Sequence, residues 1–357
     1  MRKIEMESEL ELIMNSFDTF VSDFFEWIII QNPQDSDAEL AKKINEDDTS
    51  LGKVARRSLV QRLLISFVRC PERNLIYFLY LYYIKNYKNI IDGIPFLESK
   101  FSSGTLGLIE STFKYFYETL IDLKTFQINY IPNYTGPKKL KREIRKQFGY
   151  EKVCPYCDFH SISHEDYSSI DHFLPKSKFP LLAIHSKNLV ISCAGCNDRI
   201  KLDRYELPVI HPLYEDVTMS IKFNFNQSID KIEIEYIGKN VLEIKSAIAF
   251  TNLFKLKEVY NTVLYRLRAD RKEIRDAVES NWMKIENPRK DYNMLKKLLD
   301  DEYNSFLIKN IKKRGYFGLT KLRIDFCDFL QEKGKEVDLE YLAGKLSIKI
   351  DNEVLLA

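Results

Sequence analysis

Two Cys-x-x-Cys pairs constrain the fold of this chain more than any other feature. The pairs are Cys154/Cys157 and Cys193/Cys196, with 35 residues between them. Each pair offers two thiolates from a tight turn, and a closed tetrahedral zinc site takes four such ligands. Two separate redox pairs are the alternative, but no thioredoxin-like strand–helix–strand pattern surrounds either pair. The spacing therefore predicts one structural zinc site, closed to catalysis, with a folded segment between its halves.

Composition places the chain among folded proteins. Its 357 residues are 45% apolar and 13% aromatic, which excludes a disordered tail, and the net charge of +2 neither demands nor excludes a nucleic-acid partner. Cys70 and Cys327 stand alone and are expected in the core. The start of the chain has no apolar segment typical of a secretory signal, and the most apolar stretch, Asn74–Tyr83, is too short to span a bilayer. A cytoplasmic protein without membrane contact is predicted.

Helical periodicity occupies both flanks of the cysteine region. Apolar residues at three-and-four spacing and helix-breaking residues predict helices at Glu7–Ile30, Ser58–Val68, Arg73–Tyr87, Leu106–Leu123, Val241–Glu279, Tyr292–Lys312, Thr320–Glu332 and Asp338–Leu346. Asn129–Pro137 has the composition of a linker, and the alternation within Met219–Ile237 predicts a β-hairpin. The expected organisation is a helical domain at 1–137, a central module at 138–216, a hairpin at 217–238 and a helical domain at 239–357.

A strongly basic stretch precedes the first cysteine pair. Residues 138–146 contain six cations and one acid. Leu140 and Ile144 are four residues apart and could anchor one side of a helix. A solvated helix face and a phosphate-contacting helix both fit this pattern. The cations considered for contact with nucleic acid are Lys138, Lys139, Lys141, Arg142, Arg145 and Lys146.

Polar residues suited to phosphodiester hydrolysis lie between and beside the cysteine pairs. Asp171 and His172 are adjacent, Asn188 follows 16 residues after His172, and Asn197 comes directly after Cys196. A neutral imidazole can take a proton from water near pH 7. A carboxylate and an amide oxygen are hard ligands that suit Mg²⁺ or Mn²⁺ and leave positions for water and phosphate.

The run CPYCDFHSISHEDYSSIDHFLPKSKFPLLAIHSKNLVISCAGCNDRIK resembles the HNH endonuclease family in the version framed by two zinc knuckles. The resemblance implies a ββα-metal module, and hence an α+β protein in which this module and the hairpin stand between mainly helical domains. It implies that His172 is the general base and that Asn188 positions it. It further implies that Asp171 and Asn197 hold a catalytic Mg²⁺ or Mn²⁺, and that the cleaved product carries a 5′ phosphate.

The wider layout resembles the HNH subunits of bacterial anti-phage systems, such as Septu and some retron-linked operons. That resemblance implies a nuclease that works beside a partner ATPase. DNA is the expected substrate, and RNA is the alternative. A zinc-stabilised scaffold that binds nucleic acid or protein is the alternative, its nuclease core being inactive or gated by a partner. Oligomeric state and activating trigger stay open.

Two departures from the family pattern affect the site. The family often carries a basic residue three positions after the last Asn, where this chain has Ile200; Arg199 or Lys201 could take its place at the phosphate. Neighbouring residues on a regular strand also point to opposite faces, so Asp171 and His172 share a site only if the strand end is irregular.

The other histidines and the charge of the module complete the prediction. His160 and His164 are expected in an exposed loop and His185 in a packed or hydrogen-bonded position, while an approach of His211 to substrate stays open. Residues 150–216 carry ten acids and seven cations, so basic flanks must attract a polyanion. Besides residues 138–146, the candidates are Arg266, Arg268, Arg271 and Lys272.

Overall fold

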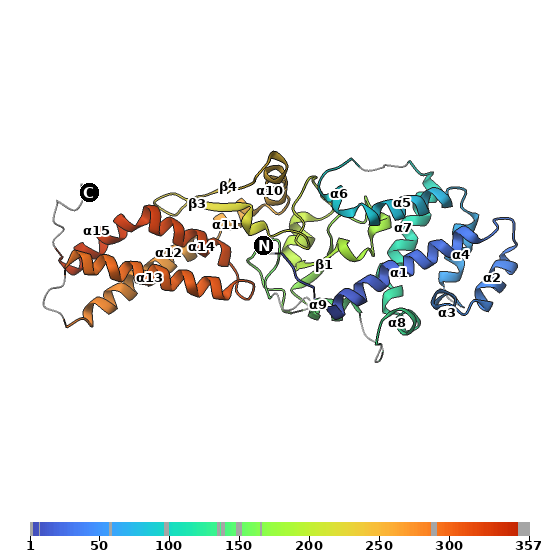
Figure 1. The fold of residues 1–357 in the computed structure, drawn as a ribbon, viewed down its shortest axis with the longest axis horizontal. Coiled ribbons are helices and arrows are strands. Elements are labelled where there is room, and N and C mark those ends of the chain that lie inside the picture. Colours follow the sequence, from blue (N-terminus) through green and yellow to red (C-terminus); the bar gives the residue numbers. More distant parts are fainter. Residues whose placement is uncertain are drawn as a thin grey trace.

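The computed structural model describes residues 3–6, 8–56, 59–95, 100–133, 136, 140–147, 152–164, 166–286 and 291–348. The molecule is elongated, with one group of helices at each end and the strand β1 between them (Figure 1). None of the helices in this described part combines the length and the apolar character that crossing a bilayer requires.

The N-terminal half is built from helices packed around the longest of them. In chain order they are α1 (Ser8–Ile30), α2 (Asp37–Glu46), α3 (Ser50–Ala55), α4 (Leu59–Arg69), α5 (Arg73–Lys85), α6 (Tyr87–Ile91), α7 (Ser103–Glu118), the short η1 (Leu120–Asp122) and α8 (Lys124–Tyr130). The periodic apolar face of α1 is buried, and its Phe20 and Phe24 rings meet Phe116 at 5.0 and 5.2 Å in edge-to-face contacts. The apolar spacing in the sequence thus marks the core correctly.

The predicted N-terminal helices are confirmed, but the sequence reading missed α2 and α3. Both are short and begin at local caps: Ser36 and Glu39 form a reciprocal capping box before α2, and Thr49 caps α3. The predicted linker at 129–137 also begins inside α8, and residues 134, 135 and 137–139 lie outside the described part. Capping chemistry therefore carried a signal that apolar periodicity alone did not.

The C-terminal half joins a β-hairpin to a second group of helices. The hairpin strands β3 (Ile221–Phe225) and β4 (Ile232–Tyr236) pair antiparallel, as predicted, with Phe223 opposite Ile234. The helices are α10 (Val241–Leu253), α11 (Leu256–Asn261), α12 (Leu264–Met283), α13 (Tyr292–Lys313), α14 (Thr320–Phe329), the π-helical η7 (Leu330–Gly334) and α15 (Lys335–Leu346). Phe225 packs on Phe326 of α14 with ring centroids 5.4 Å apart, which fixes the hairpin to the helices.

The central region contains a second antiparallel pair of strands. They are β1 (Ser168–His172) and β2 (Leu189–Cys193), with Asp171 opposite Val190, and a short π-helix, η5 (Gly195–Lys201), follows β2 directly. Helix α9 (Leu140–Gln147) packs against β1. The described chain is thus mostly helical with two small antiparallel sheets, and Cys70 and Cys327 are buried as expected.

Candidate metal centre and adjoining pocket

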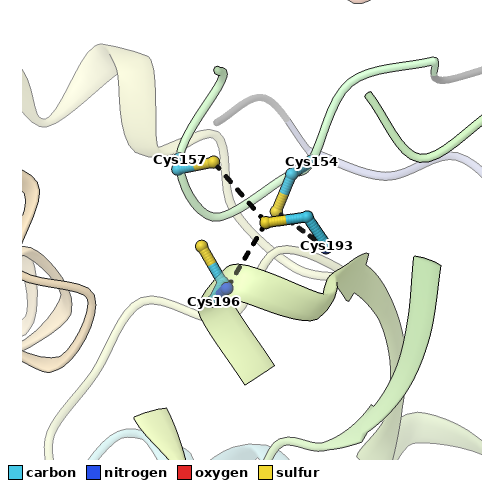
Figure 2. A group of neighbouring side chains, drawn as sticks. All are labelled: Cys154, Cys157, Cys193 and Cys196. Carbon is cyan, nitrogen blue, oxygen red and sulfur yellow. Dashed lines mark hydrogen bonds between the residues drawn. The ribbon is translucent and has the colours of Figure 1, made fainter. Parts of the chain in front are cut away.

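The four predicted zinc cysteines converge in one buried cluster (Figure 2). Their sulfur atoms lie within 4.8 Å of one another, and none forms a disulfide. At the zinc–sulfur distance of about 2.3 Å, the sulfurs of a tetrahedral site stand close to 4 Å apart, and those of Cys157 and Cys193 are 4.0 Å apart. The donor set and its spacing fit a structural zinc ion.

Backbone amides and one histidine surround the sulfurs. The amide of Cys193 donates to the sulfur of Cys154 at 3.3 Å, and the amide of Cys196 donates to the sulfur of Cys193 at 3.4 Å. Hydrogen bonds with the neighbouring thiols lower the pKa of Cys154 against the opposing effect of burial, whereas the hydrogen bond with Cys154 raises the pKa of Cys157 and of Cys196. Such a cluster needs a cation before all four sulfurs can be thiolates.

Asp171 lies at the end of β1 in a buried polar network. Its side chain is 2% exposed; Oδ1 accepts from the Lys201 ammonium at 2.9 Å, and Oδ2 accepts from the Tyr156 hydroxyl at 2.8 Å. Burial raises the pKa of Asp171, and the charge of Lys201 opposes that shift. Tyr156 sits between the first two cysteines, so the knuckle itself helps to position this carboxylate.

Lys201 is not placed for contact with nucleic acid. It is fully buried at the end of η5, where its ammonium also donates to the carbonyl of His172 at 2.8 Å. A buried ammonium compensates a buried carboxylate, and turning it toward solvent leaves Asp171 unpaired. Arg199 is exposed, so of the two cations that flank Ile200 only Arg199 is open to solvent.

His172 is the last residue of β1 and is half-buried against the ring of Tyr117, whose centroid lies 4.5 Å away. Its Nε2 lies 2.9 Å from the carbonyl oxygen of Ala183, which can only accept, so Nε2 carries the proton and Nδ1 is left as a lone-pair acceptor. Burial lowers the pKa of His172 to about 3, and the charge of Lys176 adds to this shift. The imidazole is therefore neutral near pH 7, as a general base requires.

Asn188 ties together the loop that holds the imidazole. It is fully buried; its Nδ2 donates to the carbonyls of Leu174 and Leu182 at 3.0 Å each, and its Oδ1 accepts from the amide of Leu174 at 2.7 Å. Leu182 precedes Ala183, whose carbonyl oxygen meets His172. Asn188 thus braces the segment that carries the Ala183 carbonyl, and its role in positioning His172 stays a prediction.

Asn197 stands in the first turn of η5. Its Nδ2 donates to the hydroxyl of Ser169 at 2.6 Å, an anchor that fixes the amide and leaves its oxygen as the donor atom for a cation. The basic residue was expected three positions after Asn197, but Lys201 comes four positions after it. The wider turn of the π-helix η5 still directs Lys201 inward, to Asp171.

Asp171, His172 and Asn197 line one open pocket of 560 Å³, together with Tyr117, Lys176 and Asp198. The strand end therefore brings the two neighbours Asp171 and His172 to a common space. One carboxylate, one amide oxygen and room for water and phosphate match the way proteins hold Mg²⁺ or Mn²⁺. The Asp171 oxygens keep lone pairs beyond those used by Tyr156 and Lys201.

The other histidines lie away from this pocket. His164 is exposed as expected, and His160 is exposed with Nδ1 3.6 Å from the sulfur of Cys193. His185 is buried and bonded to Asp18 at 2.8 Å, which confirms a hydrogen-bonded position. His211 is fully buried, and the ring of Phe173 lies 4.1 Å from it, so it is a core residue.

The basic flanks are only partly as predicted. Leu140 and Ile144 anchor α9, each 1% exposed, and Arg142 faces solvent. Lys138 and Lys139 lie outside the described residues, and nothing is described of the side chain of Lys146. In the second set, Arg271 was wrongly expected to face a polyanion, because it is 8% exposed and paired with Asp338 at 2.7 Å.

The sequence reading did not anticipate several groups that complete the pocket. Tyr156 was visible inside the first cysteine pair but carried no signal of its bond to Asp171. Tyr117 comes from α7, and the rings of Tyr117 and His172 meet only in the folded chain. Lys176 follows the DHFLP segment, and its ammonium lies 5.3 Å over the ring of Tyr117.

Comparison with known proteins gives one informative similarity. A segment of 92 residues, 26% of this chain, is 34% identical to the Septu protein PtuB of Bacillus thuringiensis. The match spans about a third of that relative, 35% of its length. No family model matches the chain, and no solved structure matches it.

Proposed function

We propose that this protein is a metal-dependent endonuclease of the HNH type that hydrolyses phosphodiester bonds, with DNA as the preferred substrate over RNA. The observation that carries the proposal is the setting of His172. Its neutral imidazole is oriented by the Ala183 carbonyl and opens into a pocket that it shares with Asp171 and Asn197. The β1–β2–η5 order, with the four cysteines beside it, agrees with the ββα module that the sequence resembles.

The chain's own residues account for most of the chemistry. Nδ1 of His172 accepts the proton of a water molecule that attacks phosphorus, while the bond from Nε2 to Ala183 keeps the ring in the required tautomer and orientation. Asn188 holds that carbonyl in place through Leu182. Asp171 and Asn197 would hold the divalent cation, which when bound supplies charge stabilisation at the leaving oxygen.

The biological setting is proposed from the similarity to the Septu protein PtuB. The layout also resembles the HNH subunits of anti-phage operons, and a partner ATPase belongs to that setting. We divide the chain into a helical domain at 1–137, the nuclease module with its basic helix at 138–216, a hairpin at 217–238 and a helical domain at 239–357, the helical domains being available to a partner.

A gated form of the same enzyme is the second candidate, favoured by one observation. Both oxygens of Asp171 are engaged by Tyr156 and Lys201, and the side chain is 2% exposed. A nuclease silent until a partner shifts this network, or a scaffold with an inactive core, is consistent with that burial. Assays with and without the protein encoded beside it separate these cases.

The proposal is tested by cleavage assays on wild type and His172→Ala, each loaded with zinc and freed of other metals. Supercoiled DNA, single-stranded DNA and a tRNA pool are incubated with and without Mg²⁺ or Mn²⁺. We expect cation-dependent cleavage that falls by about 10²- to 10⁴-fold in His172→Ala, as for loss of a general base. His164→Ala, which changes an exposed histidine, is the matched control. Equal rates in wild type and His172→Ala contradict the proposal.

A further inference from the structure

Three large aromatic side chains are exposed beside the first cysteine pair. Tyr265 lies at the start of α12, and Tyr316 and Phe317 lie in the turn between α13 and α14; their exposed fractions are 56%, 53% and 56%. The segments that carry them meet at Phe159, because Arg266 lies over its ring and Gly318 touches its backbone. Exposed rings on such neighbouring segments are unfavourable in water and mark a site of interaction. They lie outside the pocket around His172.

The backbone that carries these rings is fixed to the zinc region. The amide of Lys152 donates to the carbonyl of Gly315 at 3.0 Å, and the amide of Lys321 donates to Oδ2 of Asp158 at 2.9 Å. Gly318 approaches the knuckle so closely that a Cβ there would stand 2.3 Å from the carbonyl oxygen of Phe159. The rings are therefore presented on an ordered turn, which limits the entropy lost on binding.

Cations accompany the rings. The guanidinium of Arg266 lies 5.2 Å over Phe159 and 5.8 Å over Tyr265, and the ammonium of Lys313 lies 4.8 Å over Phe317. Lys152 and Lys312 are exposed nearby in sequence. Within the described residues, these four cations form no ion pair with a carboxylate, so their charge is available to an anionic ligand.

The exposed rings and cations around Phe159 lie close to the proposed catalytic pocket, and the link between them is η5. The ring of His160 lies 3.9 Å from the position of a Cβ on Gly195, which opens η5, and Asn197 two residues later lines the pocket. The central segment itself has an excess of acids, so a polyanion needs a basic surface close by. The cations that accompany the exposed rings provide such a basic surface.

We propose that this aromatic–basic patch, formed by Phe159, Tyr265, Arg266, Lys313, Tyr316 and Phe317, binds unpaired nucleotides of a single-stranded segment. Bases stack on the rings while phosphates meet the cations, the pairing of interactions that single-strand-binding surfaces use. Bases in a duplex are already stacked on one another and offer no free faces, so the patch favours single strands. The inference rests on the proposed function for its choice of nucleic acid as the ligand.

The test measures binding rather than cleavage. Full-length, zinc-loaded protein without other divalent cations is titrated against a fluorescein-labelled oligothymidylate and a duplex of equal length, and fluorescence anisotropy gives both affinities. The variant is Tyr316→Ala/Phe317→Ala. The control is Tyr341→Ala, which removes another ring that is 47% exposed and lies 4.3 Å beneath Arg275.

We expect the double variant to bind the single strand about tenfold or more weakly, because each base that loses its stacking partner weakens binding. The duplex affinity should change far less, and Tyr341→Ala should match wild type. Unchanged single-strand affinity overturns the inference, and this is the result expected if the patch binds a protein partner. An equal loss of affinity for the single strand and the duplex also overturns it. Cleavage assays on the same proteins separate the two proposals, since binding lost without any wild-type cleavage contradicts only the proposed function.

Discussion

The four cysteines and the pocket around His172 occupy the same small region but are organised in opposite ways. The cysteine sulfurs are buried and face one another, which leaves no open position. The pocket gathers Asp171, His172 and Asn197 around open space. The first arrangement suits a metal that only stabilises, and the second suits a metal that must also admit water and phosphate.

The two regions also depend on their surroundings to different degrees. The cysteines come from two tight turns and need little besides local backbone amides. The pocket needs Tyr156 from the knuckle, Tyr117 from α7 and Lys201 from the end of η5. A ligand set fixed by local spacing can therefore be predicted from a sequence, whereas the pocket proposed to be reactive is completed by side chains that only folding brings together.

The largest effect should come from breaking the cysteine cluster. Cys193→Ser removes one thiolate, and structural zinc in zinc-finger peptides contributes about 10–16 kcal/mol of apparent binding free energy that is also folding free energy. We expect loss of bound zinc and unfolding of the central region. Metal analysis and thermal denaturation measure both, with Cys327→Ser as the control at a buried cysteine outside the cluster. Full zinc content and an unchanged melting temperature contradict the assignment.

Breaking the buried ion pair beside the pocket should have the next largest effect. Lys201→Met leaves the Asp171 carboxylate buried without its counter-ion, and we expect a loss of about 3–5 kcal/mol in unfolding free energy. Lys176→Met removes an ammonium from a half-exposed pair with Glu118 and should cost below about 1 kcal/mol. Urea denaturation compares the two variants. Adding Asp171→Asn to Lys201→Met should recover most of the loss, and equal losses in the two single variants contradict this account.

A smaller effect is expected from charge reversal on α9. Lys141→Glu/Arg142→Glu should weaken nucleic-acid binding and flatten its salt dependence, because each lost phosphate contact reduces the logarithmic salt slope by about 0.9 for duplex DNA. The control for the change in net charge is Lys296→Glu/Lys297→Glu on the exposed face of α13; unlike these lysines, Lys141 also pairs with Asp122 at 3.6 Å. Affinities measured over a range of salt concentrations decide between them. If both variants lose the same amount of affinity, net charge explains the effect and α9 has no specific contact with nucleic acid.

Near neutral pH the smallest effect is that of pH itself. The folded-state pKa of His172 is about 3, below the ordinary value, so the unfolded chain binds more protons over the interval between the two. Stability from this group is complete above about pH 6.5 and declines as the pH falls toward the folded value, by up to about 1.36 kcal/mol per pH unit. Urea unfolding of zinc-loaded protein should show a shallower decline for His172→Phe than for wild type. Equal slopes contradict a neutral, buried His172.

Much of the fold was predictable from the sequence for physical reasons. The buried face of α1 and the alternation in β3 and β4 follow directly from the periodicity of helices and strands. The short helices α2 and α3 were not predicted, because the sequence marks them by capping residues rather than by long apolar faces. Arg271 was predicted to face solvent from its position in a basic stretch. It instead forms a buried ion pair with Asp338, which lies far along the chain.

The candidate site divides in the same way. Cys154, Cys157, Cys193 and Cys196 come together as their spacing predicts. Lys201 was expected, as an alternative to Arg199, at the phosphate, and only its distance to Asp171 shows that it belongs to a buried ion pair instead. Asn188 bonds to Leu174 and Leu182 within its own loop, which local spacing anticipates, but it also accepts from the hydroxyl of Tyr87 in α6 at 2.9 Å, which local spacing does not.

The most direct test of two distinct metal sites is anomalous scattering from crystals soaked in Mn²⁺, recorded at the zinc and manganese absorption edges. The account predicts zinc at the four cysteine sulfurs and manganese in the pocket, within coordination distance of the Asn197 amide oxygen and an oxygen of Asp171. A pocket without manganese in wild-type crystals, or manganese bound elsewhere while zinc occupies the cysteines, would contradict a metal-dependent active site beside a structural one.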